Sequence, residues 1–257
     1  MKDESIIKIG HNIKYDIAVL KKYDVDVISY DDTMLMSYSC DAGAHRHNMD
    51  ELAKIHLGRE TIKFKDVVGS GKSQLTFDQV DLKKATEYAA EDAEITFKLY
   101  RFLKKRVQQE KNTLVYSNIE KPLIDSLVKM EINGIKVDSN YLQKLSNDFS
   151  KRILDLEQKI YKETEIEFNI GSPKQLSDVL FDKLRLKPPK KTKTGERSTG
   201  IEVLEDLAYE GNKVVKDIIE WRQLSKLKNT YTEALQSHIV NKTKRIHTSY
   251  AMASTNT

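Results

Sequence analysis

Cysteine, proline and glycine are scarce in this sequence: its 257 residues include one Cys, four Pro and ten Gly. Cys40 alone cannot form a disulfide within the chain, so we interpret it as a small packing residue in a reducing compartment. No apolar run approaches the roughly 18 residues of a membrane-spanning helix, and the first residues do not resemble a signal peptide. We therefore expect a cytoplasmic protein with no membrane partner.

An excess of charge of either sign is also lacking. The formal net charge is +4 and the pI is about 8.8, which permits a polyanionic partner without requiring one. Charged residues make up 32% and hydrophobic residues 39% of the chain, as in a soluble, helix-rich protein of one large or two ordinary domains. Positive charge is concentrated at residues 187–197, which we interpret as a solvated loop.

Residues 5 to about 109 alternate between strand and helix patterns. Short β-branched runs predict strands at residues 5–9 and 25–28. Helices are predicted at residues 32–39, 49–56 and 82–109, the last being a long run without Gly or Pro in which apolar residues recur at helical spacing. Residues 63–76 have the composition of a loop. The pattern predicts an α/β domain whose sheet is incomplete at its start.

From about residue 113 the pattern is nearly all helical. Apolar stripes predict helices at residues 119–133, 139–160 and 213–237, and a shorter helix up to residue 208. Ser172 followed by Pro173 is typical of another helix start. The narrow apolar stripe of residues 139–160 predicts packing against a partner helix. Residues 245–250 alternate as a strand does.

Two motifs carry oxygen ligands. Tyr88 and Asp92 lie one helical turn apart in the predicted 82–109 helix, so the phenol and the carboxylate face the same space. Asp16 lies in the first turn of a helix that follows the first strand, where α/β sheets usually place ligands. Alone, each motif has a structural explanation, such as a core aromatic residue or a favourable helix dipole. Together they suggest a site for a hard divalent cation.

The two motifs are similar to known exonuclease sequences. Asn12 to Asp16 (Asn-x-x-x-Asp) and Tyr88 to Asp92 (Tyr-x-x-x-Asp) resemble the second and third exonuclease motifs of family A DNA polymerases of the bacterial DNA polymerase I kind. Further stretches follow the order and spacing of that family: Arg46-His47-Asn48-Met49-Asp50, Thr61-Ile62-Lys63-Phe64, Gln74-Leu75-Thr76-Phe77, Asn133-Gly134-Ile135-Lys136-Val137-Asp138, Leu227-Lys228-Asn229-Thr230-Tyr231 and Arg245-Ile246-His247-Thr248-Ser249-Tyr250. The resemblance thus extends over essentially the whole chain.

The resemblance implies two domains. Residues 1–112 would be the C-terminal part of an α/β ribonuclease H-like 3′-5′ exonuclease domain, truncated at its N-terminus. Residues 113–257 would begin the polymerase domain and would be mostly its mainly α-helical thumb. The palm and fingers motifs are not in this sequence, so we expect a fragment of a larger enzyme, cut at both ends and inactive in polymerisation.

The resemblance also implies roles for individual residues. Asp16, Tyr88 and Asp92 would be catalytic, with Asp16 and Asp92 binding Mg²⁺ (or Mn²⁺ or Zn²⁺), Asp16 partly through water, and with Tyr88 orienting the attacking water. The single-stranded 3′ end would be bound by Asn12, Tyr15, Arg46 and Phe64, and duplex DNA by Arg222, Lys226, Lys228 and Asn229. The family's two-metal site uses two further acidic residues in an Asp-x-Glu motif that this sequence lacks, so the site would be incomplete.

As a whole, the resemblance implies part of a DNA-directed DNA polymerase I with a proofreading exonuclease, acting in DNA replication and repair as a monomer associated with the bacterial nucleoid. Its partners would be primer-template DNA and a frayed 3′ end. Two alternatives stay open. A free-standing ribonuclease D-like 3′-5′ exoribonuclease shares both motifs and would prefer RNA, and a non-catalytic DNA-binding remnant would lack metal-dependent digestion.

Overall fold

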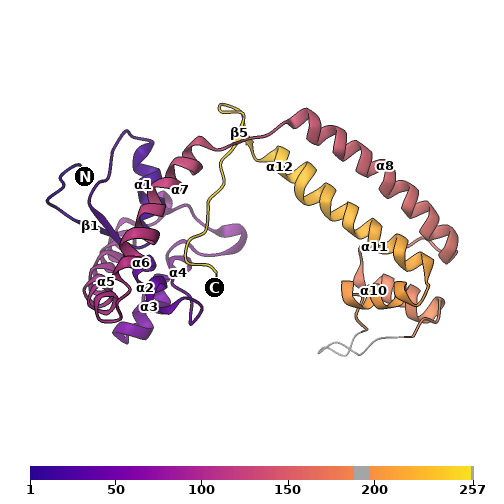
Figure 1. Ribbon diagram of the computed structural model, residues 1–257, viewed down its shortest axis with the longest axis horizontal. Helices are drawn as coiled ribbons and strands as arrows, with labels where there is room; N and C mark the ends of the chain where they lie inside the picture. Colours follow the sequence, from indigo (N-terminus) through magenta and orange to yellow (C-terminus); the bar gives the residue numbers. More distant parts are fainter. Residues whose placement is uncertain (188–196, 256–257) are drawn as a thin grey trace. The chain divides into compact units, whose positions relative to one another are not determined.

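Figure 1 shows the computed structural model, which describes residues 1–187 and 197–255 apart from the side chain of Lys72. Most of the predicted basic loop at residues 187–197 therefore lies outside the described residues. The chain forms two compact units: the first contains Met1–Gly134 and the segment from His247 onward, and the second contains Ile135–Ile246. The chain thus leaves the first unit after Gly134 and returns to it.

The sheet of the first unit consists of two short parallel strands, β1 (Lys8–Gly10) and β2 (Tyr30–Asp32), connected through helix α1 (Ile13–Lys21). The prediction of a strand at residues 25–28 was wrong. Asp24 and Ser29 on either side have φ values of 56° and 53°, so the extended run is interrupted at both ends. Val27 is buried in the core without pairing in the sheet.

Helices make up most of the first unit. They are α2 (Thr33–Asp41), α3 (Met49–Leu52), the π-helical turn η1 (Ala53–Leu57), α4 (Phe64–Val68), the 3-10 turns η2 (Gly71–Ser73) and η3 (Phe77–Gln79), α5 (Leu82–Gln109), α6 (Thr113–Val115), the π-helical turn η4 (Tyr116–Glu120) and α7 (Lys121–Asn133). The predicted bounds of α5 are confirmed, and Asp81 caps it by accepting from the amides of Lys83 and Lys84 at 3.1 and 3.3 Å. Helix α4 was not predicted, because Gly69 ends it after five residues.

The core of the first unit lies along one face of α5. Ile95, Leu99 and Leu103 recur every four residues and are fully buried, together with Leu35 of α2 and Ile124 of α7. Burial of this apolar stripe, more than helix propensity, keeps α5 folded. The exposed face of α5 is left for the residues described below.

Asp32, at the end of β2, connects the starts of two helices. Its side chain is 1% exposed and accepts hydrogen bonds from the amides of Leu35 (3.1 Å), Ile13 (2.7 Å) and Asn12 (3.3 Å). Burial raises the pKa of Asp32 to about 6, which outweighs the opposite effect of these hydrogen bonds. The carboxyl group thereby satisfies amides at the beginning of both α1 and α2.

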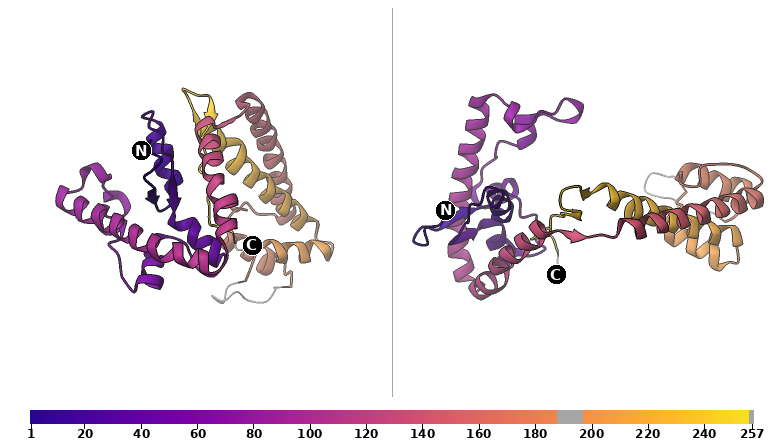
Figure 2. Two further views of the ribbon diagram at one scale, coloured as in Figure 1. Left: turned by 60° about the vertical axis from the view of Figure 1, so that its left-hand side comes forward. Right: turned by 90° about the horizontal axis from the view of Figure 1, so that it is seen from above.

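The second unit contains α8 (Ser139–Thr164), α9 (Pro173–Ser177), the π-helical segment η5 (Asp178–Lys183), α10 (Ile201–Tyr209), α11 (Lys213–Lys226), the π-helical segment η6 (Leu227–Glu233) and α12 (Ala234–Ser237). Figures 1 and 2 show α8 and α11 side by side, so the predicted pairing of the narrow-striped helix is confirmed. Ile160, Leu180, Leu204 and Ile218 are fully buried between these helices.

A three-stranded antiparallel sheet, with the order β3 (Ile135–Lys136), β5 (Arg245–Ile246) and β4 (Ile239–Val240), lies where the chain enters and leaves the second unit. The predicted strand at residues 245–250 is therefore paired over two residues only, since the chain joins the first unit from His247 onward. The first compact unit extends through α7. The predicted boundary after residue 112 is a different one, between the two domains of the family, and it stays a prediction. Among the described helices, none has the length and apolarity needed to span a membrane.

Candidate functional site

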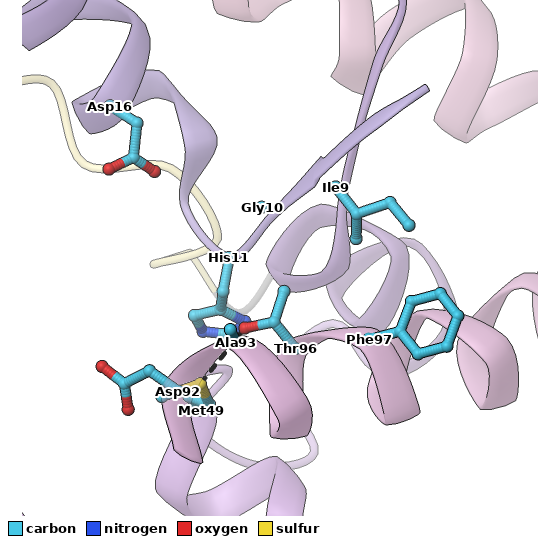
Figure 3. Close-up of a pocket in the computed structure, with 9 residues that line it drawn as sticks. All are labelled: Ile9, Gly10, His11, Asp16, Met49, Asp92, Ala93, Thr96 and Phe97. Atoms are coloured by element: carbon cyan, nitrogen blue, oxygen red, sulfur yellow. Dashed lines mark hydrogen bonds between the residues drawn. The ribbon is translucent and has the colours of Figure 1, made fainter. Parts of the chain in front are cut away.

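A pocket of about 510 Å³ lies in the first unit, between the β1–α1 junction and α5. Its lining consists of Ile9, Gly10, His11, Asp16, Met49, Asp92, Ala93, Thr96 and Phe97. Figure 3 shows Asp16 projecting from α1 and Asp92 from α5. The structure therefore brings the carboxylates of both sequence motifs to one cavity.

The turn between β1 and α1 places Asp16. A Cβ atom on Gly10 would lie 2.7 Å from the side chain of Ile13, so the close approach of strand and helix requires glycine. Asn12 precedes α1 with a φ of 59°, a left-handed conformation that Asn tolerates better than most residues. These two residues turn the chain sharply enough to put Asp16 in the first helical turn.

The two carboxylates of the pocket are both easier to protonate than ordinary aspartates. Asp16 is exposed, yet the surrounding protein removes enough water from its carboxylate to raise its pKa. Burial, followed by the charges of Asp50 and Glu91, raises the pKa of half-buried Asp92, whereas Tyr88 lowers it. A divalent cation would offset the negative charge that gathers around Asp92.

Tyr88 lies one turn before Asp92 on α5. Burial and hydrogen bonding to the Asp92 carboxylate raise the pKa of Tyr88 to about 12. The phenol therefore keeps its proton at neutral pH and donates it to Asp92, while its oxygen can still accept a hydrogen bond from a water molecule. The predicted shared orientation of Tyr88 and Asp92 is consistent with this interaction.

His11 lines the same pocket and was not singled out from the sequence. Its Nδ1 lies 2.9 Å from Oγ1 of Thr33, whose hydroxyl donates to the carbonyl of Gly10 at 3.1 Å. Burial lowers the pKa of His11 to about 4, so its imidazole is neutral at physiological pH. The only sequence signal for His11 was its place directly before Asn12, where the Asn-x-x-x-Asp motif begins.

Three aromatic rings form what we call the aromatic cluster: Phe64 of α4, Phe77 of η3 and Tyr88 of α5. Their ring centroids are 5.9 to 6.1 Å apart. Phe64 and Phe77 are 48% and 41% exposed, so the cluster presents aromatic surface to solvent beside Tyr88. Unpaired bases stack on such surfaces. Phe77 was missed because the sequence does not show that an apolar residue of this stretch is exposed.

Glu91 of α5 binds the segment that precedes α4 through two hydrogen bonds. Its carboxylate accepts hydrogen bonds from Nη2 of Arg59 at 3.1 Å and from the amide of Ile62 at 2.6 Å. Arg59 also pairs with Glu94 at 2.9 Å. These contacts, made by the neighbour of Asp92, hold the chain that leads into Phe64 against the helix that carries Tyr88.

None of the other residues predicted to bind a 3′ end is among those that line the main pocket. Asn12 is half-buried just before α1, and Tyr15 is 66% exposed on α1. Arg46 is exposed and lines a different pocket of the first unit, of about 340 Å³, with His45 and His47. The structure thus places Phe64 beside Tyr88 and puts Arg46 elsewhere on the unit.

The residues predicted to bind duplex DNA lie along the end of α11 and in η6. Arg222 is half-buried and donates from Nη1 to the carbonyl of Thr199 at 2.6 Å, and desolvation lowers its pKa. Lys228 pairs with Glu233 at 3.4 Å. Lys226 and Asn229 are exposed, and within the described chain no carboxylate pairs with Lys226. Lys226 is therefore the more accessible cation of the set.

Comparison with protein families defines the class. Residues 1–108 match the family described as 3′-5′ exonuclease, and residues 139–257 match DNA polymerase family A. The chain therefore combines an exonuclease segment with a following segment of a family A polymerase domain. Domains of both families use divalent metal ions, and the oxygen ligands of Asp16 and Asp92 suit such ions.

Individual relatives specify the family further. The chain is 49% identical over 257 residues to DNA polymerase I of Rhizobium leguminosarum, a match that covers 100% of this chain and 25% of that protein. It is 42% identical over 258 residues to DNA polymerase I of Pseudomonas aeruginosa, covering 98% of this chain and 28% of the relative. The chain belongs to the bacterial DNA polymerase I family and spans about a quarter of the length of these relatives.

A solved structure agrees with this assignment. The polymerase domain of Pol1 from M. smegmatis, in complex with a DNA primer-template and dNTP, is similar with a TM-score of 0.78 and 27% sequence identity. The match covers 96% of this chain and 40% of that one.

Proposed function

We propose that this chain is the part of a DNA polymerase I that joins its 3′-5′ proofreading exonuclease, within residues 1–112, to its thumb, within residues 113–257. One observation carries the exonuclease role: Asp16 and Asp92, from motifs far apart in sequence, line the same pocket, and Tyr88 contacts Asp92. The match of residues 139–257 to DNA polymerase family A favours this function over a ribonuclease D-like enzyme. The complete enzyme would act as a monomer in DNA replication and repair.

The chemistry proposed for the pocket is hydrolysis of the terminal phosphodiester of a DNA strand. Asp16 and Asp92 would hold a divalent cation such as Mg²⁺, which supplies charge stabilisation and lowers the pKa of a bound water. Tyr88, whose proton is donated to Asp92, would accept a hydrogen bond from this water and so orient it. Because these are two carboxylates only, they would form part of a two-metal site rather than all of it.

The proposed substrate is a frayed 3′ end. The aromatic cluster offers stacking surface next to Tyr88, and Asn12 and Tyr15 flank the turn that carries Asp16. Arg46 would contact phosphate further along the strand, consistent with its place in a separate pocket. In the second unit, Arg222, Lys226, Lys228 and Asn229 would follow the duplex backbone, with Lys226 making the most direct contact.

The test uses the polymerase that carries these residues, with a primer that ends in a mismatch. Asp16→Asn and Asp92→Asn should each lower removal of the mismatched nucleotide at least a hundredfold and leave templated incorporation unchanged. Asp26→Asn is the matched control, because Asp26 is an exposed partner of Lys2 and Lys21. Unchanged removal in both variants would refute the exonuclease role, and faster digestion of RNA than of DNA would support the ribonuclease alternative.

A further inference from the structure

A second group of metal-ligating side chains lies in the first unit, apart from the pocket of Asp16 and Asp92. Asp41 is the last residue of α2, His45 lies in the loop that follows, and His56 lies in the π-helical turn η1. One ligand atom from each of these three residues lies within 4.8 Å of the other two. A two-imidazole, one-carboxylate set is typical of sites for Zn²⁺ and related divalent cations.

Two imidazole nitrogens in this region are buried without a partner. Nε2 of His56 and Nε2 of His47 have no hydrogen bond among the described residues. An unsatisfied buried polar atom costs free energy and calls for an explanation such as an absent ion.

His45 is oriented as a ligand. Its Nδ1 lies 2.9 Å from the carbonyl oxygen of Arg46, to which it can only donate, so Nε2 is the nitrogen left to face Asp41. That Nε2 lies 3.5 Å from Oδ2 of Asp41. A proton on this nitrogen would make an ordinary ion pair with Asp41, and a metal ion could take the same place between the two atoms. The separation is close to the roughly 3.3 Å between two ligands of tetrahedral zinc.

Arg106 of α5 supports the carboxylate from the other side. Its Nη2 donates to Oδ1 of Asp41 at 2.8 Å, and its Nη1 contacts Oδ2. Nε of Arg106 donates to Glu110 at 2.5 Å, which fixes the guanidinium. Metal ligands are commonly held by such outer hydrogen bonds. A cation bound through Oδ2 would replace the Nη1 contact and leave the bond to Oδ1 in place.

We propose that Asp41, His45 and His56 form a binding site for Zn²⁺ or a similar imidazole-binding divalent cation, distinct from the oxygen-ligand pocket of Asp16 and Asp92. His47, whose ring centroid lies 4.9 Å from that of His45, borders the site. The bound ion would connect the end of α2 to η1 and fix the loop that carries Arg46. The proposal rests on these residues alone and stands whether or not the exonuclease function is correct.

The experiment titrates ZnCl₂ into the 257-residue chain, followed by calorimetry and by thermal unfolding. An Asp16→Asn/Asp92→Asn background removes the oxygen ligands of the other pocket. In that background we expect one Zn²⁺ per chain that excess Mg²⁺ does not displace, and a visible absorption band of four-coordinate cobalt when Co²⁺ is the probe. His45→Gln and His56→Gln should each weaken Zn²⁺ binding at least tenfold and remove the rise in unfolding temperature.

His238→Gln, at an exposed histidine of the second unit, is the matched control and should bind Zn²⁺ like the background. Circular dichroism of each variant without metal checks its fold, and His45→Gln, in a loop, keeps the test available if His56→Gln does not fold. Zn²⁺ binding unchanged in His45→Gln would overturn the proposal. So would loss of the single Zn²⁺ in the Asp16→Asn/Asp92→Asn background, because the ion would then belong to the carboxylate pocket.

Discussion

Lys14 of α1 and Glu131 of α7 form a buried ion pair within the first unit, with side chains only 4% and 12% exposed. Glu131 also accepts the amide of Tyr250 at 2.8 Å, and its carbonyl oxygen lies 2.9 Å from Nδ1 of His247. One glutamate therefore holds both the helix that carries Asp16 and the segment that returns from the second unit.

Lys14→Met should lower the free energy of unfolding by about 3–5 kcal/mol, because it leaves the Glu131 charge buried without its cation. The measurement is urea unfolding of the purified chain. Arg152→Met is the matched control, since Arg152 and Glu220 form a pair with side chains 56% and 46% exposed, and it should cost at most about 1 kcal/mol. Equal losses of unfolding free energy in the two variants would show that burial of the Lys14 pair adds nothing to the stability of the chain.

Asp32 should give stability an unusual pH dependence. Its pKa in the folded chain is about 6, above the ordinary 3.8, so the folded state holds the proton more tightly than the unfolded state. The stabilisation that protonated Asp32 gives to the folded chain is complete below about pH 4 and is lost as the pH rises through 6. Relative to Asp32→Asn, the unmodified chain should therefore lose about 2 kcal/mol of unfolding free energy between pH 4 and 7.

The measurement is the urea midpoint of both chains across this pH range. Asp26→Asn provides a control of opposite sign, because hydrogen bonding to Lys21 lowers the pKa of Asp26 and its contribution is lost as the pH falls. A difference between the unmodified chain and Asp32→Asn that stays constant with pH would contradict the raised pKa of Asp32.

Phe77→Ala should weaken binding of a short single-stranded DNA as much as Phe64→Ala does. Both rings belong to the aromatic cluster beside Tyr88, and loss of one stacked base contact costs about 1–3 kcal/mol. Fluorescence anisotropy of a labelled oligonucleotide measures the affinity. Tyr23→Ala removes an aromatic ring of the same unit that is 75% exposed and should have no effect. Normal affinity of Phe77→Ala would exclude Phe77 from the binding surface.

Lys226→Gln should reduce the salt dependence of duplex DNA binding. If Lys226 contacts one phosphate, the slope of log K against log salt concentration should become shallower by about 0.9. Lys216→Gln, at an exposed lysine near the other end of α11, is the control. Equal slopes for the unmodified chain and Lys226→Gln would remove Lys226 from the interface.

Arg222→Ala should lower the free energy of unfolding of the chain. Its guanidinium donates to the carbonyl of Thr199, and loss of that donor leaves a partly buried acceptor unsatisfied at a cost of about 1–3 kcal/mol. The urea midpoint should therefore fall, whereas Lys226→Gln should leave it unchanged. An unaltered midpoint together with weakened DNA binding would instead assign Arg222 directly to the duplex contact.

Long periodic segments were predictable from the sequence, and short irregular ones were not. The bounds of α5 followed from an apolar stripe uninterrupted by Gly or Pro, and the same helix placed Tyr88 and Asp92 on one face. The strand expected at residues 25–28 failed because Asp24 and Ser29 turn the backbone into the left-handed region, which no periodicity reveals. Local pattern is a weak guide where the backbone changes direction.

The candidate site was predictable only as far as its motifs. Asp16 and Asp92 could be paired because each lay in a recognisable motif, and the structure brings them to one pocket. Phe77 joins this site by packing its ring against Tyr88 of the next helix, and His11 by a contact with Thr33 in another element. Arg222 is engaged by a carbonyl 23 residues away. These contacts depend on how the folded chain packs, and the spacing of residues in the sequence does not reveal that packing.

Because the segment from His247 onward belongs to the first unit, the ribosome completes that unit only after it has made the second one. The ribosome completes Ile135–Ile246 before it makes the segment whose Tyr250 amide binds Glu131. A nascent chain that has emerged only as far as α7 can therefore form the Lys14–Glu131 pair but leaves that carboxylate without its amide donor. Full protection of the first unit from proteolysis should arise last, after the helical unit has already left the exit tunnel.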